Sequence, residues 1–279
     1  MSIPRTRARS ASPPPPSTSG RPLTPLESRR PRSVRPEGPF RWLEPDDLAE
    51  QIVLWGSVGT ELARIRSQMK HIDDFVACDI DPPTRLLFVG PSGTGKSLAA
   101  WTIGAALGVP VCVADLGSFV GKHLGETSAH ISLAFRTAAA EGAILFLDEL
   151  DGVQQSRSRG GSGDSAGAEM LRSTTTFFQQ LDWAPKRQII IAATNHPELV
   201  DVALVRRFTT QLTFDMPSRP ARARLVSGWL SKVTDVSEGE LERLVTAGDG
   251  ISCADLRSQV MAFGRHKIVT RLKLEEAEG

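Results

Sequence analysis

One stretch decides the fold: Gly90-Pro91-Ser92-Gly93-Thr94-Gly95-Lys96-Ser97. It matches the pattern G-x-x-x-x-G-K-[ST] of the phosphate-binding loop. A short apolar run of strand length precedes it at 85–89, and a helical pattern follows it at 98–107. This motif requires a glycine loop between a strand and a helix, so the match predicts a nucleotide-phosphate site rather than a chance glycine-rich turn.

The residue types of this loop explain how it would hold a triphosphate. Its glycines permit backbone conformations that turn N–H groups inward, beside the positive end of the following helix. Lys96 is expected to reach the β- and γ-phosphates of ATP, and Ser97 to bind Mg²⁺. Together with Asp148, an acid at the end of a later predicted strand, the predicted nucleotide-binding residues are Gly90, Pro91, Ser92, Gly93, Thr94, Gly95, Lys96, Ser97 and Leu98.

The composition is that of an ordinary globular protein, with 40% hydrophobic and 23% charged residues in a chain of 279. A net charge of +1 favours neither nucleic acid nor a membrane as the partner of the whole chain. No apolar run approaches the roughly 20 residues of a membrane-spanning helix. Cys78, Cys112 and Cys253 lack metal-ligand spacing and indicate a reducing compartment, so we expect a cytoplasmic protein.

The first 40 residues differ from the rest of the chain. They hold four consecutive prolines and eight arginines against two acids, with few apolar residues. Such a segment cannot bury enough surface to offset its ordering entropy, so residues 1–40 are predicted to be a disordered arm. Two interpretations stay open: a solvated terminus, or an electrostatic contact with an acidic partner or nucleic acid.

The next part of the chain alternates between strands and helices and predicts an α/β domain over 41–217. Because the predicted strand at 143–147 is apolar throughout, we expect a parallel sheet that helices cover on both faces. The five predicted strands are 85–89, 109–113, 143–147, 189–193 and 211–214. From residue 218 the pattern is helical. The capping-box patterns Ser237-x-x-Glu240 and Ser252-x-x-Asp255 start two of its helices, which predicts a small all-helical domain over 218–279.

Polar residues follow two of the predicted strands at their carboxyl ends, where open α/β sheets bind ligands. Asp148 and Glu149 end the third strand. Asp148 is expected to hold Mg²⁺ through water, and Glu149 to polarise the attacking water. Asn195 ends the fourth strand, within reach of the γ-phosphate or that water. The sequence therefore predicts phosphoryl transfer to water.

Two arginines, Arg206 and Arg207, end a short helical pattern that starts near Asp201. Cations at a helix C-terminus are stabilised by the helix dipole, which is one interpretation. The other is an arginine finger, a cation that stabilises charge in the transition state of phosphoryl transfer. With the second interpretation, the predicted catalytic residues are Glu149, Asn195, Arg206 and Arg207.

Taken in order, these motifs resemble the AAA+ ATPases, and within them the AAA branch that includes katanin, spastin and FtsH. The resemblance covers about residues 50–270. It includes the Walker A loop, the Walker B acids Asp148 and Glu149, a sensor 1 at Thr194-Asn195, the second region of homology at 201–208, and a lid signature at 250–256. It implies a five-stranded parallel sheet in the order 5-1-4-3-2, a helical lid, and ATP with Mg²⁺. It also implies a ring, usually a hexamer, in which Arg206 and Arg207 reach the γ-phosphate of the neighbouring subunit.

The sequence departs from this family at two places. The segment 121–126 aligns with the pore loop that grips substrate, but His123 stands where an aromatic residue is usual. Cys253-Ala254 occupies the place where other AAA+ branches carry a sensor 2 arginine. Two further segments each have two interpretations. Residues 52–56 are either an apolar slot for the nucleotide base or a structural apolar segment. Arg157 and Arg159, on a glycine-rich loop, either face the pore or belong to a solvated flexible loop.

Three functions remain open at this stage. The first is a ring motor that remodels or disassembles an unidentified protein partner. The second is a regulatory ATPase that switches a separate effector, such as a protease, without threading it. The third is a nucleic-acid motor that uses the basic arm, and the near-neutral charge of the ATPase region argues against it.

Overall fold

A computed structural model describes residues 38–48, 56–117, 126–151, 164–233 and 236–278 of the chain. Several predictions lie outside the described residues: the arm up to residue 37, most of the base slot at 52–56, the pore-loop residues 121–125, and Arg157 with Arg159.

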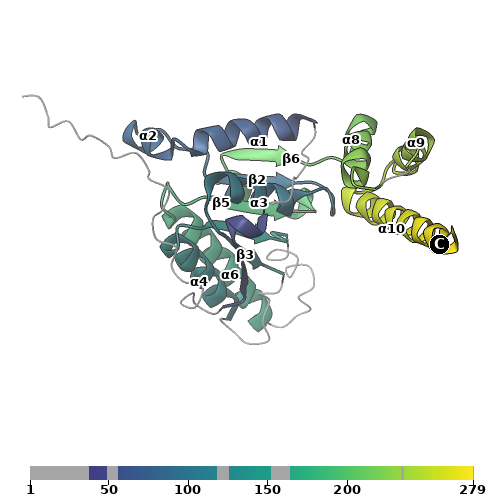
Figure 1. Cartoon of the computed structure of the whole chain (residues 1–279). Coiled ribbons are helices and arrows are strands. Elements are labelled where there is room, and N and C mark those ends of the chain that lie inside the picture. Colours follow the sequence, from purple (N-terminus) through teal and green to yellow (C-terminus); the bar gives the residue numbers. More distant parts are fainter. Residues whose placement is uncertain (1–37, 49–55, 118–125, 152–163, 234–235, 279) are drawn as a thin grey trace, which may run out of the picture. The chain divides into compact units, whose positions relative to one another are not determined.

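A six-stranded sheet forms the centre of the α/β part (Figure 1). Its strands lie in the order β1 (Phe40–Leu43), β3 (Val111–Asp115), β4 (Ile144–Asp148), β5 (Ile190–Thr194), β2 (Arg85–Val89) and β6 (Thr210–Thr213). Strands β3, β4, β5, β2 and β6 pair in parallel. These are the five predicted strands in the predicted order.

The sheet also has a sixth strand, so the prediction of five strands was incomplete. β1 pairs with β3 in antiparallel register, from Phe40 opposite Ala114 to Leu43 opposite Val111. Phe40 and Trp42 meet edge to face, with ring centroids 6.1 Å apart, and pack against the core. Four residues beside a proline-rich segment give little strand signal, and only pairing with the edge of β3 makes them a strand.

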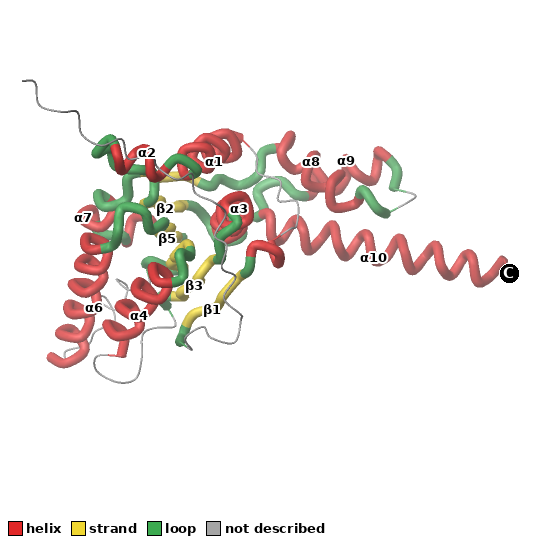
Figure 2. The backbone as a smooth tube through the Cα atoms, turned by 60° about the vertical axis from the view of Figure 1, so that its left-hand side comes forward, coloured by secondary structure: helices red, strands yellow, loops and turns green. Residues whose placement is uncertain are grey.

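Helices cover both faces of the sheet, as predicted (Figures 1 and 2). On one face lie α1 (Gly56–Met69), α2 (Ile72–Ala77) and α3 (Lys96–Leu107), which share a buried core with the strands. On the other face lie α4 (Glu126–Ala140) and α6 (Asp164–Trp183). A 3₁₀ helix, η2, covers Pro45–Leu48.

Two of the covering helices, α1 and α4, bury apolar residues that recur at helical spacing. Leu62, Ile65 and Met69 of α1 are at most 2% exposed. In α4 the buried side chains include Ile131, Ala134, Phe135 and Ala138, which recur at helical spacing. The apolar strands of the sheet are therefore enclosed on both sides, as a parallel sheet requires.

After β5 the chain forms a 3₁₀ turn η3 (Pro197–Leu199) and the short helix α7 (Val202–Val205). Beyond β6 it is entirely helical in its described residues: α8 (Arg219–Leu230), α9 (Glu238–Ala247) and α10 (Cys253–Glu278). These three helices have their own buried core. A reciprocal capping box at Ser237 starts α9, as predicted. Among the described helices, none is long and apolar enough to cross a membrane.

Candidate nucleotide site

The loop between β2 and α3 has the backbone of an anion cradle. Gly93 and Gly95 adopt left-handed conformations, with φ of +74° and +100°. Gly95 is also the N-cap of α3, and it has no side chain to occupy the first N–H groups of that helix. These donors and the positive end of α3 are therefore available to a phosphate. The Thr94 hydroxyl donates to Pro91 O at 2.8 Å and closes the turn.

The start of α10 contacts the tip of this loop. Ala254 N donates to Gly93 O at 3.1 Å. A Cβ atom placed on Gly93 would lie 2.6 Å from Ser252 Oγ and 3.1 Å from the Cβ of Ala254. Only glycine fits between the loop backbone and the helix start at this distance. The helical C-terminal part thus contacts the predicted phosphate site directly, through the residues of its predicted lid signature.

Lys96 joins the loop to the neighbouring strand. Its side chain is 7% exposed, and Nζ donates to Gly90 O at 2.6 Å, Pro91 O at 2.8 Å and Asn195 Oδ1 at 2.7 Å. Burial lowers the pKa of Lys96, and the carboxylates of Asp148 and Asp151 oppose that change. The three acceptors are neutral, so the ammonium group can exchange them for phosphate oxygens, whose negative charge makes the bonds stronger. The residues present therefore fit a triphosphate.

Ser97 and Asp148 meet at the carboxyl end of β4, as two ligands of one metal ion should. Ser97 Oγ lies 3.4 Å from Asp148 Oδ2. Burial is the main reason that the pKa of Asp148 is raised. Within the described ranges, no group of three or more His, Cys, Asp or Glu side chains could hold a metal ion. A Mg²⁺ ion would therefore take further oxygens from phosphate and water, as it usually does in nucleotide sites.

Glu149 turns the chain sharply after β4. Its φ of +53° is unusual for a residue other than glycine, and such strain often marks functional positions. Its N–H donates to Asp148 Oδ1 at 3.1 Å, and its carboxylate approaches Gly117. The pKa of Glu149 is raised by burial and by the nearby charges of Asp115, Asp148 and Asp151.

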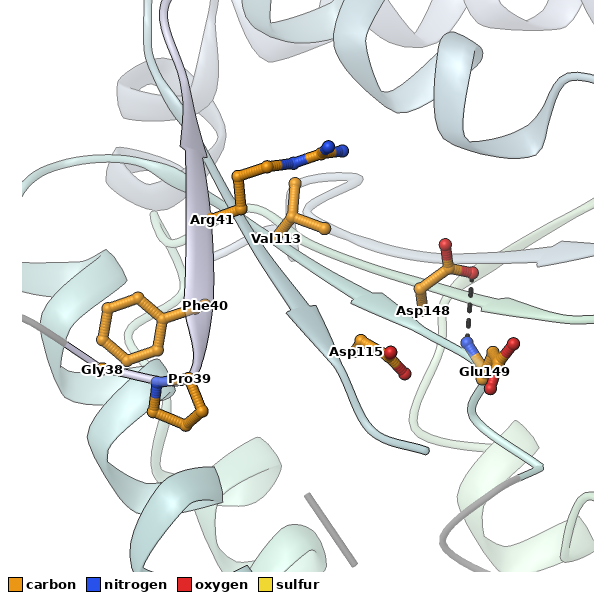
Figure 3. Close-up of a pocket in the computed structure, with 8 residues that line it drawn as sticks. All are labelled: Gly38, Pro39, Phe40, Arg41, Val113, Asp115, Asp148 and Glu149. Atoms are coloured by element: carbon orange, nitrogen blue, oxygen red, sulfur yellow. Dashed lines mark hydrogen bonds between the residues drawn. The ribbon is translucent and has the colours of Figure 1, made fainter. Parts of the chain in front are cut away.

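A cavity of about 600 Å³ opens beside these acids (Figure 3). Asp115, Asp148 and Glu149 line it from the ends of β3 and β4, and Arg41 of β1 lines it from the sheet edge. Asp115 lies opposite Asp148 in the strand register. Water can therefore approach Glu149 from this side.

The two predicted finger arginines have different surroundings. Arg207 forms a bidentate pair with Asp182, at 2.7 and 3.0 Å, and its Nη1 donates to Ala203 O at 2.8 Å. Its guanidinium also stacks 4.7 Å from the ring centroid of Phe178. Arg206 is the C-cap of α7 and its side chain is exposed. The structure thus gathers Lys96 and its neighbours in one site, and holds Arg207 against α6.

Sequence reasoning missed the acid Asp151 next to this site, and its contact with Thr194 of the predicted sensor 1. Asp151 is 6% exposed, Thr194 is 1% exposed, and the Thr194 hydroxyl donates to Asp151 Oδ1 at 2.9 Å. The available signal for Asp151 was a second acid two residues after Glu149.

Taken together, the glycine loop, the parallel sheet and the acids at its carboxyl edge define a P-loop nucleotide-binding domain. Comparison with known proteins narrows this class. Residues 86–216 match the family described as "ATPase family associated with various cellular activities (AAA)". The chain belongs to these AAA ATPases, on the branch that includes FtsH-like and katanin-like proteins.

Three similar proteins illustrate this relationship. An ATP-dependent zinc metalloprotease FtsH of Marinobacter nauticus is 32% identical over 208 residues, which are 73% of this chain and 33% of the relative. The 26S proteasome subunit RPT4 of Saccharomyces cerevisiae is 31% identical, over 70% of this chain and 45% of that subunit. The chain thus spans less than half the length of these relatives. The structure of the FIGL-1 AAA domain in complex with ADP aligns with a TM-score of 0.62 at 25% identity, covering 82% of this chain and 77% of that one.

Proposed function

We propose that this chain binds ATP with Mg²⁺ and hydrolyses it to ADP and phosphate. One observation carries the proposal: Lys96 Nζ, inside the phosphate loop, lies 2.7 Å from Asn195 Oδ1, at the end of the adjacent strand β5. This contact brings the predicted phosphate ligand and the predicted γ-phosphate sensor to one point. The ADP bound in the FIGL-1 AAA domain structure supports the same kind of ligand.

Each residue has a role that follows from its position. Gly90, Gly93, Gly95 and the first turn of α3 bind phosphate oxygens through N–H groups. Lys96 neutralises the β- and γ-phosphates, and Ser97 with Asp148 holds the metal ion. Bound Mg²⁺ supplies charge neutralisation at the phosphate oxygens. Glu149 accepts a proton from the attacking water, and Asn195 orients that water or the γ-phosphate.

We further propose that the site is completed by a second copy of the chain in a ring, as a hexamer. Arg206 is exposed, whereas Arg207 is bound to Asp182 and Ala203 of its own chain. Arg206 is therefore the arginine that is free to reach a neighbour's γ-phosphate, and Arg207 fixes the end of α7. The free thiols Cys78, Cys112 and Cys253 fit a cytoplasmic location.

The ATPase cycle is proposed to remodel or disassemble a protein partner. Two similar proteins are named as an ATP-dependent protease and a proteasome subunit, which supports a protein as the partner. A regulatory ATPase that switches an effector without threading is the second candidate, because His123 replaces the usual aromatic residue of the pore loop. His123→Ala separates the two: a threading motor loses partner processing but keeps ATP hydrolysis, and a switch keeps both.

The test of the proposed function uses Glu149→Gln in the full chain. This variant should bind ATP and Mg²⁺, hydrolyse almost none, and retain its partner in an ATP-dependent complex. Lys96→Ala is the matched control, because it should bind neither ATP nor the partner. Hydrolysis by Glu149→Gln at the rate of the unaltered chain would overturn the assignment of Glu149.

A further inference from the structure

Asp151 is a buried acid that the roles given above do not use. It follows the strained turn at Glu149, and its side chain is 6% exposed. Leu150, which stands between Glu149 and Asp151 in the chain, is fully buried and donates its N–H to Ala193 O at 2.9 Å. The pairing of β4 with β5 therefore continues past Glu149, and it carries Asp151 to the end of β5.

At the end of β5 the Thr194 hydroxyl both donates and accepts a hydrogen bond. It donates to Asp151 Oδ1 at 2.9 Å and accepts from His196 N at 3.0 Å. Asn195 lies between Thr194 and His196 in the chain, and its Oδ1 accepts a hydrogen bond from Lys96 Nζ at 2.7 Å. The two hydrogen bonds of the Thr194 hydroxyl thus hold the 194–196 turn, and Asn195 of this turn contacts Lys96 of the phosphate loop.

Packing alone does not account for a carboxylate here. Burying a carboxylate is costly unless it is paired or hydrogen-bonded, and an apolar or amide side chain fills such a space at lower cost. The charge of Asp151 also reaches the site, since it raises the pKa of Lys96 against the effect of burial. Residues that orient a functional group are often buried and hydrogen-bonded in this way.

We propose that Asp151 is a positioning residue for ATP hydrolysis, which acts by holding the Thr194 hydroxyl so that the 194–196 turn presents Asn195 to the γ-phosphate. The same carboxylate anchors the turn that carries Glu149 to the end of β5. This inference rests on the proposed roles of Asn195 and Glu149 in hydrolysis.

The first test removes the hydroxyl and keeps the shape. Thr194→Val in the full chain should lower kcat about 10- to 100-fold, as for other residues that orient a functional group, with the Kd for ATP changed only a few-fold. Thr194→Ser keeps the hydroxyl and should retain most of kcat. Thr84→Val is the matched control, because Thr84 is also buried, at 2% exposed, and its hydroxyl donates to Lys186 O at 2.9 Å. Thr84 precedes the first residue of β2, whereas the phosphate loop follows the last residue of that strand. Thr84→Val should lower Tm and leave kcat unchanged.

The second test separates the hydrogen bond from the charge at Asp151. Asp151→Asn keeps an oxygen acceptor for Thr194 and should lose less kcat than Asp151→Ala, which removes both. If Asp151 acts through Asn195, then Asp151→Ala should lower kcat much less in an Asn195→Ala background than in the unaltered chain.

The outcomes that overturn the inference are distinct from those that overturn the proposed function. A normal kcat for Thr194→Val, or an equal loss for Thr84→Val, contradicts the positioning role while leaving Asn195 in place. Additive losses for the pair Asp151 and Asn195 contradict it as well. If Asn195→Ala keeps its full kcat, the assigned role of Asn195 is wrong, and the positioning role is lost with it.

Discussion

Arg206 is proposed to reach the γ-phosphate of a neighbouring subunit, whereas Arg207 fixes the end of α7, and these two roles can be tested by mixing variant subunits. An arginine finger supplied by a neighbour contributes on the order of 10³ to 10⁵ in rate, so Arg206→Ala should reduce kcat by that factor while ATP binding persists. Arg207→Ala breaks a half-exposed ion pair, worth about 0–1 kcal/mol, and a stacking contact worth about 0.5–1 kcal/mol. It should therefore lower stability by about 1 kcal/mol and reduce kcat less than Arg206→Ala does.

The assay mixes two inactive variants. Arg206→Ala keeps the phosphate loop and lacks the finger, whereas Lys96→Ala lacks the loop lysine and keeps the finger. In a random equimolar mixture, about one quarter of the contacts between subunits pair an intact loop with an intact finger. ATPase activity should therefore reappear on mixing, at about a quarter of the rate per subunit of the unaltered ring.

The result that would refute this reasoning is equally definite. If the finger acted within its own chain, no mixture of the two variants could restore activity. Mixtures that stay inactive although sizing shows joint assembly would therefore contradict a site shared between subunits. So would Arg206→Ala with the kcat of the unaltered chain at every protein concentration.

Three further predictions concern stability. Burial raises the pKa of Asp148 in the folded, nucleotide-free protein, so the folded state binds that proton more tightly than the unfolded chain does and stability falls as pH rises above the ordinary carboxyl range. Asp148→Asn should therefore raise Tm at pH 7 and weaken this pH dependence. A lower Tm at pH 7 would contradict this explanation. Ser237→Ala removes the cap of α9 and should cost about 0.5–2 kcal/mol in urea unfolding, so an unchanged midpoint would count against the cap. Gly93→Ala places a Cβ atom at a residue with a φ of +74° and against Ser252 Oγ, whereas Gly108→Ala places one at a φ of +67° in open space. Gly93→Ala should therefore lose more stability than Gly108→Ala in thermal unfolding. Equal losses would show that the contact with Ser252 does not matter for stability.

Much of the fold was predictable because the sequence signals are local. Four of the five parallel strands are mostly apolar runs, whereas β6 is mostly polar. Polar residues lie at the carboxyl ends of two strands, with Asp148 at the end of β4 and Asn195 after β5. The phosphate loop itself is a continuous motif. These features gave the strand order through the resemblance to a known family, and they gave the residues that now meet around Lys96.

The features that were missed depend on contacts between distant segments. β1 is a strand because its four residues pair with β3, about 70 positions further along the chain, and no local pattern reports that pairing. The hydrogen bond from Thr194 to Asp151 likewise joins residues 43 positions apart. The bidentate contact of Arg207 with Asp182 is of the same kind, so the sequence could not separate the surroundings of Arg206 and Arg207.

A triphosphate is proposed to bind on the loop between β2 and α3 and to be hydrolysed there. The most direct measurement is ATP affinity by calorimetry, together with steady-state turnover, for Lys96→Ala. Lys186→Ala is the control, since Lys186 is exposed and pairs with Asp79 and Asp81. We predict that Lys96→Ala loses measurable ATP binding and turnover, while Lys186→Ala keeps both. Unchanged affinity and turnover in Lys96→Ala would contradict the account.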